Sequence, residues 1–454
     1  MILTILLPAY LLQVANLLVY GGAITAGEMF AFVAANGYES TDVWYYCVRY
    51  VMPYWLIVVI LYLVSCYSVW WFLIKKRASQ RIVGCAIVAF FAVLLCFPIR
   101  HNIYREIAVL MHEISEIHTH QYDSNGFCYH ATRTGRVAQK EIYVLSIGES
   151  LRYRNMSLNG IYPRQTTPML EQQTNLCLYS DYYANATLTQ HALPLLFTPA
   201  NTTDFNGHFN YKTIASAFSE TGFTTVLVSH RAQLMNNGYH NYLAQDFDTI
   251  VWVEHDSLIA PIMAQLAEQK QKLFVVTHYL GNHMFYTNRT EDCLMWRPDY
   301  NADTKTKSDS LFLNAYDNSI LYTDRLLSES IDSLRKTHAF VTWLFVSDHG
   351  EYISSNVSGH GHTYHPTKDE YHVPLMVWYS DEYKAAYPEK VANAFMHKDE
   401  PVCADYVFWS VLDMANIQIG STLQQKSMSI FEEPLKNKDR TLLLPNGESI
   451  KIMK

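Results

Sequence analysis

The chain of 454 residues is long enough for two or three domains, and its formal net charge of -8, with a sequence pI near 6.2, makes it mildly acidic. Its longest basic run is Lys75-Lys76-Arg77, so neither the overall charge nor its distribution favours nucleic-acid binding. The composition therefore argues against a nucleic-acid partner and leaves the other function classes open.

Three long apolar runs open the chain. Residues 1–26, 50–74 and 82–99 contain no Asp, Glu, Lys or Arg. At 1.5 Å per residue, helices of these lengths would measure about 27 to 39 Å, which is comparable with a hydrocarbon core of about 30 Å. The first run lacks the positive n-region of a signal peptide, and no small-residue cleavage site stands out. We therefore expect residues 1–99 to form a transmembrane anchor of about three helical spans.

The loop between the second and third runs predicts the orientation of this anchor. Residues 75–81 hold four cations, and the positive-inside rule places such a loop in the cytoplasm. With three spans, everything after Arg100 then lies on the opposite side, which is the periplasm in a Gram-negative cell. Residues 27–49 lie on that same side and mix aromatic with acidic residues, which suits either an interfacial segment or an ordinary loop.

Four of the eight cysteines follow the anchor, namely Cys128, Cys177, Cys293 and Cys403. An oxidising compartment would allow them to form two disulfides in any of three pairings. The other four lie in or beside the apolar runs, where a packing role is expected. None has the Cys-x-x-Cys spacing of a zinc site.

Residues 100–140 form a connector, in which 103–117 has helical periodicity. Beyond it, strands are expected at residues 141–147, 224–229, 249–253, 273–277, 339–346 and 372–378. Helices are expected at 257–270, 311–336 and 405–416, and an edge hairpin on the Asn446-Gly447 turn at 440–452. Strands that alternate with helices predict an α/β sandwich with a largely parallel sheet over residues 141–454.

Two of the expected strands deliver ionisable side chains to their carboxyl ends. The first is followed by Gly148-Glu149-Ser150, and 339–346 is followed by Ser347-Asp348-His349-Gly350-Glu351. Open α/β sheets build their sites at these ends. A carboxylate, an Asp-His pair and the nearby His360-Gly361-His362 are the ligand chemistry of a divalent metal such as zinc. A capped, solvated loop would also explain one Asp-His pair, but two such strand ends favour a metal site.

These motifs resemble those of a known family. Gly148-Glu149-Ser150 and the run from Asn155 to Pro168 resemble the opening of the membrane-bound phosphoethanolamine transferases, members of the alkaline phosphatase and sulfatase superfamily. Further blocks similar to the family are Thr277–His283, Tyr316–Asp324, Ser347–Glu351 and His372–Trp378. The resemblance covers about residues 141–380. It implies an alkaline phosphatase/sulfatase-like α/β/α sandwich after a transmembrane anchor, which in family members usually has more spans than the three expected here.

The same resemblance identifies a nucleophile. In the family a threonine five residues before a proline attacks phosphorus, and here Thr189 stands five residues before Pro194. A threonine hydroxyl is a weak nucleophile that needs a base or a metal, which fits this assignment. Thr187 is the rival, two residues earlier. Without the resemblance, a threonine in this segment would more simply be a helix cap.

The resemblance also implies roles for the other site residues. The ligands of the catalytic zinc would be Glu149, Thr189, Asp348 and His349. His283 and His360 resemble the histidines that bind the substrate phosphate or a second zinc, and either would serve as a proton shuttle. His362 and His365 stay open as alternatives to His360.

The expected activity is transfer of phosphoethanolamine from phosphatidylethanolamine to lipopolysaccharide core or lipid A, through a phospho-threonine intermediate. The enzyme would be a multi-pass protein of the bacterial inner membrane with a periplasmic catalytic domain. Asn185 and Leu195 stand where the lipid A enzymes often have a disulfide pair, which weakens the assignment to lipid A in particular. The alternatives are a manganese-preferring phosphoglycerol transferase resembling lipoteichoic acid synthase, a sulfatase-fold phosphodiesterase, and a degenerate domain with a structural role.

Overall fold

The computed structural model describes residues 24–26, 29, 59–60, 63, 67, 103–119, 127–135, 138–230, 243–290, 292–300, 308–354, 359–362, 366–424, 428–436 and 439–452. The chain divides into two compact units, Met1–Glu113 and Ile114–Lys454. The expected spans and the segment 27–49 lie almost entirely outside the described residues. Within the described part of the chain, no helix is both long and apolar enough to cross a membrane.

The connector begins with helix α6 (Ile103–Thr119), as its periodicity predicted. One acidic residue of this helix is buried in the first unit. The carboxylate of Glu106 accepts a hydrogen bond of 2.9 Å from the backbone N–H of Ala26. This bond gives a polar partner to a side chain in a residue that is only 4% exposed.

The second unit is built on a seven-stranded sheet in the order β3-β9-β8-β2-β7-β5-β6. Its strands are β2 (Glu141–Gly148), β3 (Leu176–Leu178), β5 (Thr224–Ser229), β6 (Thr249–Trp252), β7 (Lys272–His278), β8 (Phe340–Ser347) and β9 (Leu375–Tyr379). The five strands from β8 to β6 run parallel, and β9 is antiparallel to both β8 and β3. All six predicted strands are present, and the largely parallel sheet is confirmed.

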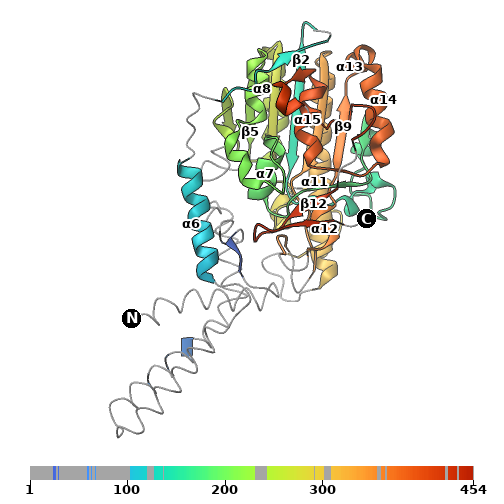
Figure 1. The fold of residues 1–454 in the computed structure, drawn as a ribbon. Coiled ribbons are helices and arrows are strands. Elements are labelled where there is room, and N and C mark those ends of the chain that lie inside the picture. The colour runs from blue at the N-terminus through green and yellow to red at the C-terminus, as the bar shows by residue number, and fades with distance from the viewer. Residues whose placement is uncertain are drawn as a thin grey trace. The chain divides into compact units, whose positions relative to one another are not determined.

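Helices cover both faces of this sheet. On one face α10 (Ile259–Gln269) and α11 (Asp309–Arg335) share a hydrophobic core with the sheet residues Val144, Val275 and Trp343. On the other face α8 (Ile214–Glu220), α13 (Asp381–Ala386) and α15 (Asp405–Met414) contact the sheet (Figure 1). Helix α14 (Pro388–Met396) follows α13. The α/β/α layering is therefore as predicted, and the three predicted helices form as α10, α11 and α15.

The central strands are mostly apolar because both faces are covered. Every residue of β2 is buried, and its Ser146 bonds to side chains of both neighbouring strands. Ser146 lies 2.7 Å from the Thr277 hydroxyl and accepts a 2.7 Å hydrogen bond from the indole N–H of Trp343. These bonds cross three adjacent strands, so the polar groups help to fix the register of β7, β2 and β8.

The C-terminal hairpin forms, but its place was predicted wrongly. Strands β12 (Thr441–Leu443) and β13 (Ser449–Lys451) pair with each other in a separate two-stranded sheet, not at the edge of the main sheet. Gly447 adopts a φ of 80° in the turn, which favours glycine. The backbone N–H of Leu443 donates to the carbonyl oxygen of Asn185 at 2.7 Å, so the hairpin packs against the segment that leads to Thr189.

The disulfides considered above do not form. Cys128, Cys177, Cys293 and Cys403 all carry thiols, and none of these four described cysteines is bridged. Cys177 lies on the short strand β3 within the core, where burial raises the pKa of its thiol to about 12. A thiol of that kind packs as a small apolar group.

Candidate active site

Two neighbouring strand ends create the site. Strands β2 and β8 pair in register, with Gly148 opposite Ser347, so Glu149 and Asp348 emerge side by side from the sheet. Glu149, Asp348 and His349 are at most 1% exposed. Two carboxylates and an imidazole are thus held together in an environment that excludes water.

Helix α7 (Thr189–Phe197) places the hydroxyl of its first residue, Thr189, beside this cluster. The Thr189 hydroxyl donates to Glu149 Oε2 at 3.1 Å and lies 3.2 Å from His349 Nε2. Because Thr189 is the first residue of the helix, the N–H groups of the first turn and the helix dipole favour an anionic group beside it. Figure 1 shows α7, α12 (Lys368–Tyr371) and the β12 hairpin toward the same end of the sheet.

The rival threonine makes no such contact. Thr187 is fully buried, and its hydroxyl forms no hydrogen bond to any residue that the structure describes. Of the two candidates, only Thr189 contacts Glu149 and His349 in the described structure, which is the arrangement expected of the nucleophile.

The spacing of the donor atoms fits a tetrahedral metal. His349 Nε2 lies 3.2 Å from Glu149 Oε1 and 3.5 Å from Asp348 Oδ2, and the two Thr189 distances are 3.1 and 3.2 Å. Zinc takes such oxygen and nitrogen ligands at about 2.0–2.2 Å, which separates two tetrahedral ligands by about 3.3–3.5 Å. Glu149, Thr189 and His349 are thus mutually close enough to share one ion, and Asp348 lies at a comparable distance from His349.

The electrostatics of the cluster favour a cation. Burial by itself lowers the pKa of His349, but the carboxylates of Asp348 and Glu149 outweigh burial and raise that pKa to about 10. His349 Nδ1 lies 2.8 Å from the carbonyl oxygen of Gly350, which can only accept, so Nδ1 carries a proton and Nε2 is the nitrogen that faces the carboxylates.

Backbone contacts hold the two strand ends in place. Asp348 Oδ1 accepts from the N–H groups of Ser150 at 3.2 Å and His349 at 2.7 Å. Ser150 has a φ of 58°, which is costly for a residue with a side chain. Its carbonyl oxygen accepts from the Tyr316 hydroxyl at 2.6 Å, so a residue on α11 stabilises the bend that aims Glu149 at the cluster.

The turn that follows β7 packs against the backbone of Glu149. Gly281 follows β7 with a φ of 50°, and a Cβ on it would lie 3.1 Å from the backbone oxygen of Glu149. The buried Asp256 accepts from the N–H groups of Leu280 and Gly281, both at 2.9 Å, and therefore fixes this turn. The roles of Asp256 and Gly281 could not be predicted from the sequence, because they depend on contacts between distant segments.

The histidines fall into two groups. His360 joins the cluster: its ring centroid lies 4.0 Å from that of His349, and ligand atoms of Glu149, His349 and His360 lie within 4.8 Å of one another. His283 is farther out, with its ring centroid 6.1 Å from that of His360. His362 instead pairs with Glu370 at 2.8 Å, and His365 lies outside the described residues.

Glu351 is a site residue whose role the sequence analysis did not identify. It is fully buried, and its Oε2 lies 3.0 Å from His360 Nδ1. Burial by itself raises the pKa of Glu351, but His360, together with His349 and His283, outweighs burial and lowers it. The run Ser347–Glu351 contained this glutamate, yet only the structure reveals its partner.

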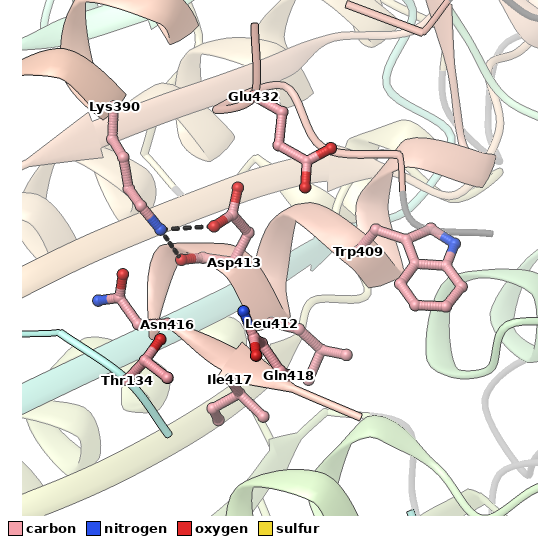
Figure 2. A pocket seen from close by; sticks show the side chains of 9 residues that line it. All are labelled: Thr134, Lys390, Trp409, Leu412, Asp413, Asn416, Ile417, Gln418 and Glu432. Atoms are coloured by element: carbon pink, nitrogen blue, oxygen red, sulfur yellow. Dashed lines mark hydrogen bonds and ion pairs between the residues drawn. The ribbon is translucent and has the colours of Figure 1, made fainter. Parts of the chain in front are cut away.

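A separate cavity of about 250 Å³ contains none of these residues. Figure 2 shows its lining, where Lys390 is held by the carboxylate and backbone oxygen of Asp413. It lies beside Thr134, whose neighbour Arg133 pairs with Glu141 at the first residue of β2. Glu149 follows the other end of this strand, about 26 Å away at 3.3 Å per residue. The cavity is thus remote from the metal-ligand cluster.

Comparisons with known proteins identify the family of the chain. Residues 141–417 match the family model described as Sulfatase. The chain is 28% identical over 293 residues to the Kdo(2)-lipid A phosphoethanolamine 7''-transferase of Salmonella typhimurium, an alignment that covers 61% of this chain and 51% of that protein. The chain therefore spans about half the length of the curated relatives it matches.

Two solved structures share the fold. The C-terminal periplasmic domain of EcEptC from Escherichia coli, in complex with Zn, aligns with a TM-score of 0.63 and 19% identity, covering 72% of this chain and 95% of that one. The integral membrane protein lipooligosaccharide phosphoethanolamine transferase A from Neisseria meningitidis aligns with a TM-score of 0.65 and 17% identity, covering 94% of this chain and 85% of that one. Because the family model covers more than half of its length, the chain belongs to the Sulfatase family.

Proposed function

We propose that the chain is a zinc-dependent phosphoethanolamine transferase, with phosphatidylethanolamine as donor and an envelope glycolipid, lipopolysaccharide core or lipid A, as acceptor. The observation that carries the proposal is the Thr189 hydroxyl, which lies within 3.2 Å of both Glu149 and His349 at the start of a helix. The names of its relatives, including the Salmonella transferase, support phosphoethanolamine as the transferred group.

Glu149, Thr189, Asp348 and His349 would hold the catalytic zinc. Their separations of 3.1 to 3.5 Å and their oxygen and nitrogen atoms fit this metal, and a related fold has been solved with Zn. When bound, the ion would lower the pKa of the threonine hydroxyl and neutralise charge on the phosphoryl oxygens. His283 and His360 would bind the substrate phosphate or a second zinc.

The reaction would then proceed in two successive displacements at phosphorus. In the first, Thr189 Oγ forms a bond to phosphorus, the bond from phosphorus to the glycerol oxygen breaks, and diacylglycerol leaves with a proton. In the second, an acceptor hydroxyl or phosphate oxygen would bond to phosphorus, the bond from phosphorus to Thr189 Oγ would break, and Oγ would take up a proton. His360 or His283 would move the protons. The first turn of α7 would bind a phosphoryl oxygen, and burial would limit loss of the intermediate to water.

We propose residues 1–99 as the membrane anchor, 100–140 as the connector and 141–454 as the catalytic domain in the periplasm. The apolar runs support this division, as does the alignment of 94% of the chain with an integral membrane protein. Donor and acceptor are both lipids, so an anchor that confines the site to their plane would raise their effective concentration.

The orientation can be tested with a reporter joined after Lys454. Four cations in residues 75–81 predict that this loop is cytoplasmic and that the C-terminus is external. Alkaline phosphatase fused there, which needs export, should be active, whereas a fused green fluorescent protein exported by the general secretory route should be dark. The opposite pattern would place the domain in the cytoplasm and remove lipopolysaccharide as an acceptor.

The donor can be tested with the purified full chain in detergent. Phosphatidylethanolamine with a labelled acyl chain should release labelled diacylglycerol, while phosphatidylglycerol with the same label should release none. Mass spectrometry of envelope glycolipids from cells with and without the gene should then reveal one added phosphoethanolamine on the acceptor. Release from phosphatidylglycerol alone would favour the phosphoglycerol transferase, and release from neither lipid would contradict lipid headgroup transfer.

A further inference from the structure

Two buried glutamate–histidine pairs lie close together in the sequence. Glu351 Oε2 is 3.0 Å from His360 Nδ1, and Glu370 Oε1 is 2.8 Å from His362 Nδ1. Both glutamates are fully buried. Only the first pair involves a histidine of the metal-ligand cluster, since ligand atoms of His360, Glu149 and His349 lie within 4.8 Å of one another.

Glu351 is fixed by contacts on its other side. Its Oε1 accepts from the Tyr286 hydroxyl at 3.1 Å, and the Tyr286 ring packs edge-on against that of Tyr316 at 5.1 Å. Tyr316 in turn holds the carbonyl oxygen of Ser150 next to Glu149. The carboxylate of Glu351 is therefore held between the Tyr286 hydroxyl and the His360 ring.

This geometry determines which nitrogen of His360 carries the proton in the neutral ring. An ionised carboxylate has no proton to donate, so His360 Nδ1 must donate to Glu351. A neutral imidazole has one donor and one acceptor nitrogen, so Nε2 is left as the acceptor. The Nδ1 atom of His283 lies 3.4 Å from the carbonyl oxygen of Met284.

We propose that Glu351 is a positioning residue that holds His360 in the Nδ1–H tautomer, with Nε2 as an acceptor available to the site. This inference rests on the proposed function. It assigns His360 to accept a proton or to bind a metal ion through Nε2, and it excludes His360 as a hydrogen-bond donor through Nε2 while the ring is neutral. Carboxylate partners of this kind orient histidine ligands and set their tautomer.

The tautomer can be measured directly. The full chain, purified in detergent, labelled with ¹⁵N-histidine and stripped of metal, would be studied by NMR at a pH where the ring is neutral. The His360 signals are identified by their loss in His360→Gln. In the unmodified chain we expect Nδ1–H with Nε2 unprotonated. Glu351→Gln replaces the carboxylate by an amide that can donate or accept, so the Nε2–H form should rise about tenfold, the difference between a charged and a neutral acceptor.

The second pair provides the matched control. Glu370→Gln makes the same substitution at an equally buried glutamate, and should change the tautomer of His362 while that of His360 stays the same. A His360 that is Nε2–H in the unmodified chain, or that keeps its tautomer in Glu351→Gln, would overturn the proposal. A His360 tautomer that changes equally in Glu370→Gln would also overturn it, because the effect would then be general.

Kinetics separate positioning from a structural effect. With Glu351→Gln we expect kcat for diacylglycerol release to fall about 10- to 100-fold, which is typical when a ligand histidine loses its carboxylate partner, with little change in KM for the donor. Glu351→Asp keeps the carboxylate and should restore part of that loss. An unchanged kcat, or equal losses in both variants, would contradict the proposal. If the tautomers are as expected but the unmodified chain transfers no headgroup, the proposed function fails and the assignment of His360 stands.

Discussion

Replacing Asp348 by Asn should remove the bound zinc and nearly all activity from the purified chain. Asp348 Oδ2 lies 3.5 Å from His349 Nε2, at the separation of two ligands of one ion, while Oδ1 accepts from Ser150 and His349. An asparagine of the same shape can keep one of these functions but carries no negative charge. We expect the rate to fall by about 10³-fold or more, since the loss of one electrostatic group alone costs about 10²–10³.

The measurement is elemental analysis of the purified chain beside the rate of diacylglycerol release. Chelation of the unmodified chain should abolish activity, and added zinc should restore it, whereas Asp348→Asn should not recover at the same zinc concentration. Asp317→Asn is the matched control. Asp317 is equally buried, but it bonds to Tyr162, Asn155 and Arg164, outside the cluster. This variant should keep its zinc. An unmodified chain that contains no divalent metal and is insensitive to chelators would contradict the proposed mechanism.

The strands that position the site could be predicted because burial on both faces leaves a clear pattern. Strand β5 has the predicted bounds, Thr224–Ser229, and the apolar runs of β2 and β8 lead directly to Glu149 and Asp348. Once adjacent parallel strands are expected, their carboxyl ends must meet at one edge. The convergence of the two motifs was therefore predictable from the sequence.

Other elements leave no such pattern. Helix α7 is buried at all nine of its positions, so it has no polar face and no period of 3.6 residues. Strand β3 has three residues, too few to show alternation. The supports of the site depend on long-range contacts: Tyr286 lies 65 residues before Glu351, and Asp256 lies 25 before Gly281. Such pairs can be recognised only after folding. Whether Cys128, Cys177, Cys293 and Cys403 pair likewise depends on which of them folding brings together, so the sequence could not reveal that these four remain thiols.

The second large effect concerns a covalent intermediate on Thr189. When donor is supplied without acceptor, the second displacement has only water to use, so a phosphoethanolamine adduct should accumulate. Peptide mass spectrometry should find one such unit on the fragment that contains Thr187 and Thr189, and fragmentation should place it on Thr189. Thr189→Ala removes the attacking oxygen and should abolish both the adduct and transfer.

Thr187→Ala is the natural control, because it removes a hydroxyl two residues away that makes no hydrogen bond in the described structure. This variant should keep the adduct, and Thr189→Ser, which keeps an attacking oxygen, should form it at a reduced rate. An adduct on Thr187 would move the nucleophile by two residues and leave the reaction class intact, and a phosphoglycerol adduct would favour the phosphoglycerol transferase. If neither threonine is modified in a chain that still turns over, transfer must be direct. The placement of Thr189 between Glu149 and His349 would then serve only to bind the metal, because a two-step mechanism requires this oxygen to bond to phosphorus.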